Sequence, residues 1–369
     1  MSEPATSSSR PRVLSGMRPT GKLHLGNYMG ALANWVKLQD SGQYECYFFI
    51  ADLHALTTDY ADTSKIAPNT LEVALDFLAA GLDPAKCTIF VQSHVKQHYE
   101  LPLLLSMITP LGWLERVPSY KEMQENLASK DLTTYGFLGY PVLMASDILL
   151  YQADFVPVGQ DQQAHVELTR EIARRFNHFY PKIRIPLHEG KDPVGDAMER
   201  WSRIPDQEKY VLPEPGVLLT PSPKLPGTDG RKMSKSYGNT ILLTDPEPEV
   251  RKKLKTMVTD PARVRRTDPG DPDKCPVGDL HKVFSTPETL AKVYEGCRSA
   301  GIGCIECKSW AADALVQVLQ PIQERRAGYS EPQVEEILKE GSLHAGARAE
   351  QTMQEVRAAM QLAHAGTDR

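Results

Sequence analysis

Residues 13–30 read Val-Leu-Ser-Gly-Met-Arg-Pro-Thr-Gly-Lys-Leu-His-Leu-Gly-Asn-Tyr-Met-Gly, and they combine three local signals in order. A short apolar run at 13–14 predicts a buried strand, and the pattern over 25–39 predicts an amphipathic helix. The turn between them is punctuated by residues that favour chain reversal, Gly16, Pro19 and Gly21. A glycine-containing turn between a strand and a helix gathers backbone N–H groups at the positive helix end. Such a turn binds anions, phosphate above all.

Four residues of this turn are candidates for contact with a bound group. His24 and Asn27 are three residues apart where the turn meets the helix, so both can face the same ligand. Gly16 and Gly26 lack side chains, which would let a ligand approach the backbone closely. Taken alone, the stretch also fits an ordinary first strand–turn–helix unit of a doubly wound sheet, with His24 a surface histidine.

A second stretch, Gly230-Arg-Lys-Met-Ser-Lys-Ser-Tyr-Gly238, carries two lysines and two serines between glycines. It resembles the lysine loop of class I aminoacyl-tRNA synthetases, and His24-Leu-Gly-Asn27 resembles their first signature. Asn27 stands where a second histidine is usual, a variation of the tryptophanyl branch. The resemblance to tryptophanyl-tRNA synthetases extends from Val13 to about Leu362, and departs from them mainly in a longer insertion around 190–215.

The composition is that of an ordinary soluble globular protein, with 41 % apolar and 24 % charged residues in a chain of 369. That length predicts two domains and a sizeable core. No apolar run approaches the roughly 18 residues that a membrane span requires, so no membrane partner is expected. Residues 1–11 predict a disordered tail and not a signal peptide. We therefore expect a cytoplasmic protein whose six cysteines are reduced or bound to metal.

Alternating strands and helices predict an α/β fold with a Rossmann-like doubly wound parallel sheet over residues 12–245. The apolar runs 44–51 and 87–92 predict buried parallel strands. Residues 154–162 predict a further strand and turn, and 63–81 predicts a helix that ends at a glycine.

Further segments depart from this alternation. Residues 99–140 read as a helical insertion, and 181–227, rich in Pro, Gly and charge without a period, as a long surface insertion. A change near residue 245 leads to an all-helical domain over 246–345, which the resemblance identifies with anticodon binding. The last segment, 346–369, predicts a helix from Gly346 that packs back on the first domain. Its apolar stripe consists of Ala349, Met353, Val356, Met360 and Ala363.

The net charge of −5 counts mildly against a nucleic-acid partner, because such proteins are often basic overall. Two local clusters soften this objection: four basic residues within 251–255, and then Arg263, Arg265 and Arg266. A basic face on an acidic protein is enough to engage phosphates, although a solvated helix face would look the same. The resemblance implies that the three arginines lie toward the anticodon stem-loop of tRNA.

Residues 137–150 predict an apolar helix that presents Tyr140, Met144 and Asp147 on one face. A carboxylate among so many apolar residues needs a partner. That partner is a helix N–H or a neighbouring cation, or else the N–H of a ligand. His54 follows the strand 44–51 at its carboxyl end, where doubly wound sheets bind ligands, although a packed, hydrogen-bonded histidine fits nearly as well.

The resemblance implies a ligase that activates tryptophan with ATP, releases pyrophosphate and transfers the amino acid to the 3′-terminal ribose of tRNA(Trp). The groups that act would be His24, Asn27, Lys232, Ser234 and Lys235. The ATP site would comprise Arg18, Pro19, Thr20, Gly26, Asn27, Gly159, Gln160, Asp161, Lys232, Met233, Ser234, Lys235 and Ser236. The tryptophan site would comprise Gly16, His54, Tyr140, Met144, Asp147, Ile148, Val156, Val158 and Gln162. The triphosphate implies Mg²⁺, and the family implies a homodimer through residues 99–140.

Within that site the roles divide by chemistry. Asp147 would accept the indole N–H, Tyr140 and Gln162 would hold the ammonium group, and Asp161 would meet the ribose hydroxyls. The ring would pack against Met144, Ile148, Val156 and Val158. The related tyrosyl enzymes typically carry glutamine at the Met144 position to meet a phenol, so tryptophan is preferred over tyrosine.

Four cysteines lie in one window with the spacing C-x21-C-x6-C-x2-C: Cys275, Cys297, Cys304 and Cys307. A disulfide is not expected without a secretory context. Zinc is the serious rival, but its sites commonly use two short hooks and only one is present. A compact three-cysteine run with a distant fourth suits a [4Fe–4S] cluster better. The arrangement resembles the cluster site of a subset of bacterial tryptophanyl-tRNA synthetases, which implies a structural cluster; zinc and free thiols stay open.

Two other functions compete with this one. A small-molecule nucleotidyltransferase would share the first signature, but it needs no helical, basic region beyond residue 245. A regulatory relative that has lost catalysis is disfavoured because Lys232 and Lys235 are both present.

Overall fold

A computed structural model describes residues 10–117, 132–159, 162–182, 203, 206–219 and 225–362. Five parallel strands form its one described sheet, in the order β3-β2-β1-β4-β5. The strands are β1 Arg12–Met17, β2 Glu45–Ile50, β3 Cys87–Val91, β4 Phe155–Val158 and β5 Gly216–Leu219. This strand order confirms the Rossmann-like, doubly wound α/β class.

The central strand β1 is the place where the strand order reverses. Its residues pair in register with β2 on one side, and Val13 pairs with Phe155 of β4 on the other. In an open parallel sheet, ligands bind at such a switch point, beyond the carboxyl ends of the strands. The turn that follows Met17 therefore lies where a site is expected.

Helices cover both faces of the sheet, which is why β2 is apolar at almost every position. One core cluster contains Phe48 with residues of α2 (Ala33–Asp40) and α4 (Ile66–Ala80). The other contains Phe49 with residues of α5 (Gln97–Ser106), α9 (Tyr140–Leu150) and α10 (Gln163–Phe179). Adjacent residues of one strand thus anchor opposite layers.

The first helix is continuous but changes its winding. It comprises α1 (Leu25–Asn27), a π-helical turn (Tyr28–Leu32) and α2, where the sequence predicted one regular helix. The prediction that α4 ends at glycine is confirmed, because Gly81 has φ 116°. Between α2 and α4 in the chain, α3 spans Asp52–Asp59.

The two segments predicted as insertions, 99–140 and 181–227, contain different elements. In the first, α6 spans Leu111–Leu114 and α8 spans Tyr135–Leu138, while 118–131 lie outside the described residues. The second includes the short helix α12, Asp206–Lys209, and the strand β5. Reading all of 181–227 as a surface insertion was therefore wrong, because 216–219 form a strand of the sheet. Four residues next to prolines are too few to reveal a strand period.

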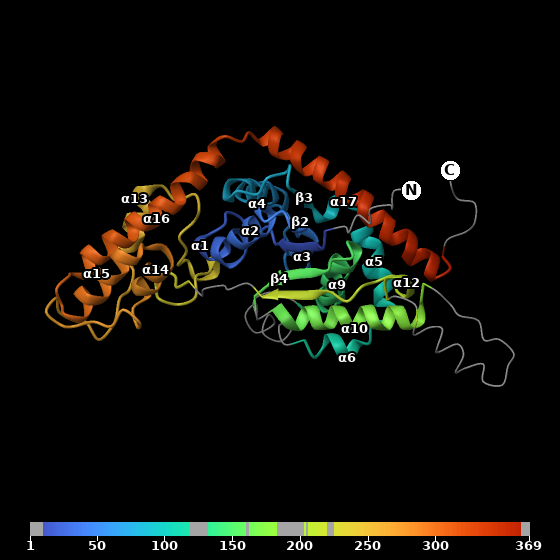
Figure 1. Ribbon diagram of the computed structural model, residues 1–369, viewed down its shortest axis with the longest axis horizontal. Helices are drawn as coiled ribbons and strands as arrows, with labels where there is room; N and C mark the ends of the chain where they lie inside the picture. Colours follow the sequence, from blue (N-terminus) through green and yellow to red (C-terminus); the bar gives the residue numbers. More distant parts are fainter. Residues whose placement is uncertain are drawn as a thin grey trace, which may run out of the picture.

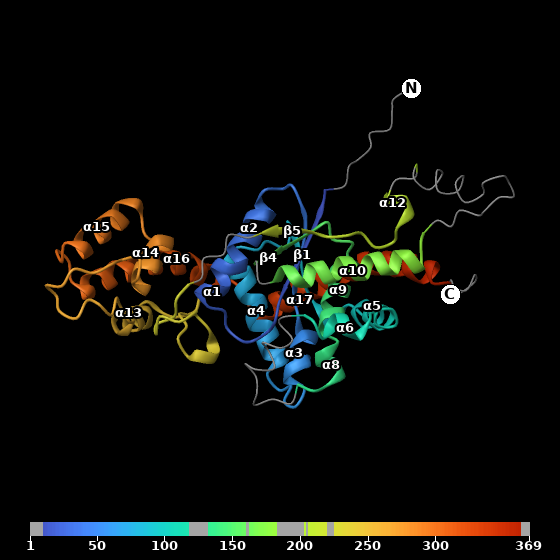
Figure 2. The same cartoon turned by 90° about the horizontal axis from the view of Figure 1, so that it is seen from below.

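Four helices form a lobe to one side of the sheet, as both views show (Figure 1, Figure 2). They are α13 Glu247–Thr256, α14 Pro276–Phe284, α15 Pro287–Arg298 and α16 Cys304–Ala327. The all-helical character of this part confirms the predicted fold class. Within the described ranges, no helix combines the length and apolarity that crossing a bilayer would take.

The long helix α17, Glu331–Ala359, begins at Glu331 and not at Gly346 as predicted. A capping box at Ser330 sets this start, and Val334, Ile337 and Leu338 continue the apolar face toward it at helical spacing, a signal that the prediction overlooked. Ala349, Met353 and Val356 are fully buried, as the stripe requires, and Met360 is half-buried. Ala363 lies outside the described residues.

α17 lies along β3, the edge strand of the sheet (Figure 1). The two backbones approach closely, since a Cβ built on Gly341 would lie 1.8 Å from the carbonyl oxygen of Ile89. The N–H of Val91 donates to Ser342 Oγ (3.4 Å), and Thr88 Oγ1 bonds His344 Nδ1 (2.9 Å). The helix thereby covers an edge that would otherwise offer unpaired groups to another chain.

Gly341→Ala is expected to destabilise the protein by at least about 2 kcal/mol, because a backbone carbonyl cannot rotate away from the added methyl. Gly346→Ala is the matched control on the same helix: nothing lies within 4 Å of its added Cβ, so it should be neutral or stabilise by up to about 1 kcal/mol. Urea unfolding followed by circular dichroism measures both variants. Equal stability of the two would contradict the close contact.

Candidate active site

A cavity of about 440 Å³ opens at the carboxyl ends of β1 and β4. It is lined by residues from strands β1 and β4, helices α3 and α9, and the start of α10. All nine residues of the expected amino-acid site are among them: Gly16, His54, Tyr140, Met144, Asp147, Ile148, Val156, Val158 and Gln162. The chain thus brings together residues that are far apart in sequence, mostly apolar, around one buried carboxylate.

The carboxylate of Asp147 is fixed by three side chains. Oδ2 bonds His54 Nε2 (2.8 Å), and Oδ1 bonds His98 Nδ1 (2.8 Å) and accepts from Gln92 Nε2 (2.7 Å). Burial favours the neutral acid, but the bonds to His54 and His98 prevail and hold the pKa of Asp147 below its ordinary value. The group is therefore ionised, and two oxygens with about four acceptor positions keep capacity for a further donor.

Both interpretations of His54 apply at once, because it lines the cavity and is hydrogen-bonded to Asp147. His98 is fully buried, and its Nε2 bonds the hydroxyl of Tyr151 (2.9 Å). Sequence reasoning missed Gln92 and His98, since each lies on a different element from Asp147. No spacing rule links them to that helix.

The cavity has further lining residues that were not predicted for it. Phe49 and His165 are among them, and Arg18, expected at ATP, lines it too. Arg18 donates to Thr58 Oγ1 and lies 3.7 Å from Asp59. His165 meets the ring of Tyr140 edge-on at 5.5 Å. The sequence signal that could have identified His165 as a cavity residue is its position one helical turn after Gln162, which was predicted for the site.

The two turn glycines each lie close to a side chain of the protein, and the close approach of a ligand to them stays a prediction. A Cβ on Gly26 would lie 2.8 Å from the imidazole of His24, and one on Gly16 would lie 2.4 Å from the ring of Phe49. Gly26 thus makes room for the His24 imidazole, whereas Gly16 makes room for the Phe49 ring and is itself exposed in the cavity. The side chain of Asn27 also turns inward, where Oδ1 accepts from the His24 N–H (3.1 Å) as a helix cap.

The lysine loop is docked on this turn. Lys235 Nζ donates to the carbonyl oxygens of Thr20 (2.9 Å) and Gly21 (2.8 Å). Burial lowers the pKa of Lys235 to about 8, with Asp76 acting in the opposite sense. The two stretches that carry the resemblance therefore meet in space, at the end of β1.

Asn239 organises the loop from inside. It is buried, its Oδ1 accepts from the Ser234 N–H (2.8 Å), and its Nδ2 donates to Asp229 (2.7 Å) and to the Lys232 carbonyl (3.2 Å). Met233 is buried in the core, so its side chain anchors the loop and is not free for ATP.

The remaining residues of the expected ATP site differ in exposure. Pro19 is buried, Gly159 is half-buried, and Thr20, Lys232 and Ser236 are exposed. Gln160 and Asp161 lie outside the described residues.

His24 is a neutral, buried histidine. Burial, and then the charge of Lys235, lower its pKa to about 4. Its Nδ1 is buried and has no hydrogen-bond partner among the described residues. A neutral imidazole carries one N–H donor, so it can bond an anionic oxygen without carrying charge itself.

Of the three arginines expected at tRNA, only two are exposed. Arg265 and Arg266 face solvent, whereas Arg263 is 8 % exposed. Its guanidinium donates to the carbonyls of Ile302 (2.6 Å) and Arg266 (3.1 Å) and approaches Cys297 Sγ at 3.7 Å. Direct contact of Arg263 with tRNA was therefore a wrong expectation, because this side chain braces the lobe internally.

The four cysteines of the lobe lie at the ends of three helices. Cys275 caps α14, Cys297 lies in the last turn of α15, and Cys304 and Cys307 begin α16. None of the four forms a disulfide. Burial, and then the charges of the other three, raise the pKa of Cys307 to about 12. Among the described residues, no three His, Cys, Asp or Glu are grouped tightly enough to hold one metal ion.

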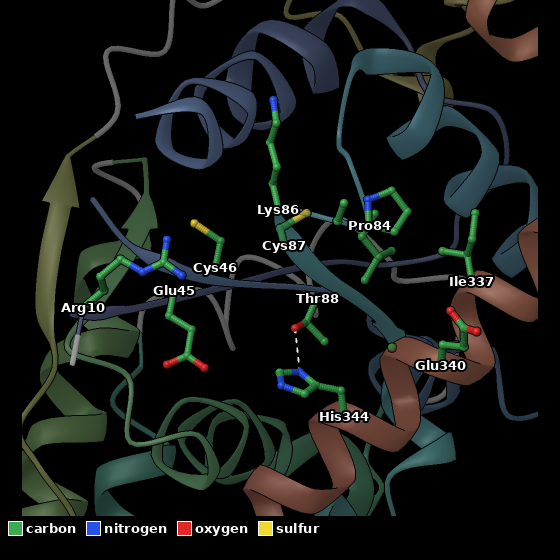
Figure 3. A pocket seen from close by; sticks show the side chains of 13 residues that line it. Arg10, Glu45, Cys46, Pro84, Lys86, Cys87, Thr88, Ile337, Glu340 and His344 are labelled. Atoms are coloured by element: carbon green, nitrogen blue, oxygen red, sulfur yellow. Dashed lines mark hydrogen bonds between the residues drawn. The ribbon is translucent and has the colours of Figure 1, made fainter. Parts of the chain in front are cut away.

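A larger cavity, of about 570 Å³, lies at the amino ends of β2 and β3 against α17 (Figure 3). Two of its polar side chains already have partners: Lys86 pairs with Asp40 (2.9 Å), and His344 bonds Thr88. Burial raises the pKa of Cys46 to about 11 and of Cys87 to about 12, so both are neutral core thiols. The smaller cavity at the switch point, with its ionised carboxylate, is the candidate site.

The chain is similar to known proteins over most of its length. The profile of the family described as "tRNA synthetases class I (W and Y)" matches residues 6–320. The tryptophan–tRNA ligase of Thermotoga maritima is 51 % identical and covers 95 % of this chain and 99 % of its own. That of Ralstonia nicotianae is 49 % identical, with 96 % and 99 % covered. The structure of tryptophanyl-tRNA synthetase from Campylobacter jejuni complexed with ADP and tryptophan matches with a TM-score of 0.78 at 32 % identity, covering 95 % of this chain and 99 % of that chain.

The imidazole of His24 is expected to titrate near pH 4 in the folded protein. An unfolded histidine titrates at about 6.5, so the unfolded chain binds more protons between these values. The stability from neutral His24 is therefore fully present above about pH 6.5 and is lost as the pH falls toward 4, by up to about 3 kcal/mol.

Unfolding free energies of the wild type and of His24→Gln between about pH 4.5 and 7 measure this loss, which the variant should lack. Lys235→Met should raise the pKa of His24 only in part, because burial is the larger cause. A wild-type imidazole that titrates near 6.5 in an NMR titration would contradict the burial.

Proposed function

Since the chain belongs to the class I tRNA synthetases for tryptophan and tyrosine, we infer that it is an ATP-dependent tryptophan–tRNA ligase. It activates L-tryptophan with ATP to the adenylate plus pyrophosphate, and then transfers tryptophan to the 3′-terminal ribose of tRNA(Trp). The observation that carries this inference is the meeting of three features at the end of β1. They are the apolar cavity with its carboxylate, the turn of residues 18–27 that contains the first signature (the signature turn), and the docked lysine loop of residues 230–238.

Activation requires the tryptophan carboxylate to attack the α-phosphate of ATP. The protein's contribution to such a displacement is to align the two reactants and to stabilise the charge that develops on the leaving pyrophosphate. We propose that Lys235 and Lys232 supply that charge stabilisation, with Ser234 as a hydrogen-bond donor. Neutral His24 would donate its N–H to a phosphate oxygen. Mg²⁺ would accompany the triphosphate and neutralise part of its charge.

The cavity supports tryptophan as the amino acid. An indole presents one N–H and a broad flat face, and an ionised carboxylate is a strong acceptor for that N–H. Asp147 is held in this state by His54 and His98. Met144, Ile148, Val156 and Val158 supply apolar contact. A phenol would leave its hydroxyl against Met144 without a partner, which costs about 1–3 kcal/mol.

The two proposed roles predict different kinetic effects, one on the rate of activation and one on the binding of the amino acid. Lys235→Ala should slow tryptophan-dependent pyrophosphate exchange by about 10²-fold or more with little change in tryptophan affinity, because its charge acts on the transition state. Asp147→Asn should weaken tryptophan binding and reduce the preference for tryptophan over tyrosine by about 1–3 kcal/mol.

Steady-state exchange kinetics and equilibrium tryptophan binding separate the two. Lys86→Ala is a matched control, because that lysine forms an exposed ion pair with Asp40 at the opposite end of the sheet. Equal effects of Lys235→Ala and Asp147→Asn on both binding and rate would mean that the role assignment is wrong.

We further propose that Cys275, Cys297, Cys304 and Cys307 hold a [4Fe–4S] cluster. Zinc sites commonly use two short cysteine hooks, and Cys304 and Cys307 form the one short hook of this set. A four-iron cluster spaces its cysteine ligands more widely, because iron and sulfide lie between them. When bound, it would serve as a structural cross-link among α14, α15 and α16.

Anaerobic purification with iron, sulfide and zinc analysis tests the cluster. About four irons and four sulfides per chain are expected, and Cys304→Ser should lose them while Cys46→Ala keeps them. Stoichiometric zinc without iron would overturn the cluster. A metal-free protein that folds and charges tRNA normally would overturn the structural role as well.

The helical lobe of α13 to α16, which lies within the predicted domain 246–345, is proposed to bind the anticodon region of tRNA(Trp). Arg265 and Arg266 are its candidate phosphate contacts, and Arg263 positions them through the Arg266 carbonyl.

We propose a homodimer that buries the exposed apolar side chains Tyr99, Leu103, Met107, Leu111 and Tyr135. A monomer mass in light scattering would contradict this proposal. The chain would work in the cytoplasm, where its substrates are.

A further inference from the structure

The last turns of α16 hold the sheet domain at several points. Gln323 Nε2 donates to the carbonyls of Leu243 (3.0 Å) and Asp245 (2.9 Å), just beyond the lysine loop. Arg325 Nε donates to the Ala79 carbonyl at the end of α4 (2.7 Å). Figure 1 shows α16 running from the helical lobe to the neighbourhood of α4. We call Gln323, Arg325 and Arg326 the α16 clamp.

Within the α16 clamp, Arg326 contacts the most deeply buried partner, Asp76. Its guanidinium bonds the carboxylate of Asp76 on α4 and also Glu72 Oε2 (2.6 Å). Asp76 is fully buried, and burial raises its pKa to about 6 although Arg326 acts in the opposite sense. An ionised carboxylate in such surroundings is tolerated only with a partner, so the two residues depend on each other.

Asp76 in turn holds the signature turn. Its Oδ2 accepts from the Leu23 N–H (2.7 Å), directly before His24. The carbonyl of Leu23 accepts from the Leu243 N–H (2.9 Å), on the segment that Gln323 also holds. Asp76 acts electrostatically on Lys235 as well. Both proposed ATP-binding segments are thus attached to the end of one helix whose other end lies in the lobe.

We propose that Asp76 and Arg326 are positioning residues for the activation step, which set the signature turn and the lysine loop relative to each other from the end of α16. Neither residue lines the amino-acid cavity, and Asp76 is fully buried. Through α16, the position of the helical lobe then influences the geometry of the ATP site. The proposal rests on the proposed role of residues 18–27 and 230–238 in binding ATP. Misplacement of reacting groups by about 1 Å can cost up to about 10²-fold in rate.

The test compares Asp76→Asn and Arg326→Gln in the full-length protein. Asn keeps an acceptor for the Leu23 N–H but removes the charge, and Gln removes the partner of that charge. In pyrophosphate exchange, each variant should raise the KM for ATP or lower kcat by at least about tenfold, with the KM for tryptophan unchanged. The double variant should be no worse than the worse single one, because both remove the same interaction.

Two further variants exclude a merely structural role. Arg326→Lys keeps a cation beside Asp76 and should recover most of the loss, to within about threefold of wild type. Arg174→Gln breaks an ion pair with Glu214 (2.6 Å) that is exposed on α10, and should change nothing. If Asp76→Asn does not fold, Gln323→Ala replaces it in the test. This variant removes the hydrogen bonds to the carbonyls of Leu243 and Asp245 without leaving a buried charge unpaired. It must also raise the KM for ATP.

The outcomes distinguish this inference from the proposed function. If Lys235→Ala leaves exchange unchanged, the proposed ATP role of the loop fails first. If Lys235→Ala slows exchange while Asp76→Asn and Arg326→Gln change only the melting temperature, the positioning role alone is overturned. Equal losses in the KM for ATP and the KM for tryptophan would overturn it too.

Discussion

The carboxyl end of β1 is the constraint on which the rest of the structure depends. The strand order reverses at β1, so helices leave the sheet on both sides of it and a crevice opens at its end. The turn after Met17 enters this crevice, and Lys235 closes on that turn from a segment far along the chain. Displacing β1 would therefore separate the amino-acid cavity, the signature turn and the lysine loop at once.

Burial and the available hydrogen-bond partners together set the charge states of the ionisable side chains near the site. Asp147 remains ionised because two imidazoles contact it, whereas Asp76 has one guanidinium and one N–H and has its pKa raised. His24 and Lys235 are both shifted toward their neutral forms by burial. The proposed ATP site thus contains groups whose charged forms are disfavoured by burial, so the approach of an anionic phosphate would favour their charged forms.

Strand–turn–helix alternation is a local signal, and it predicted the fold class. The set of nine residues around the cavity came from the resemblance to tryptophanyl-tRNA synthetases, whereas helical spacing by itself placed only Tyr140, Met144 and Asp147 on one face. The partners of Asp147 and the contact between Asp76 and Arg326 could not be predicted, since they join segments whose proximity only the folded chain creates. Arg263 was misjudged because a buried and an exposed arginine look alike in a sequence. β5 was missed because a central sheet can recruit four residues with almost no pattern of their own.

The coverage of β3 by α17 has a consequence for how the protein is made. A ribosome releases the chain from its amino end, so all five strands leave it before residues 331–359 are synthesised. Until then the outer edge of β3 lacks its cover, and unpaired strand edges are prone to join other chains. The newborn sheet therefore passes through an interval in which its five described strands are present but β3 is uncovered, and the time needed to translate residues 220–359 sets the shortest length of that interval.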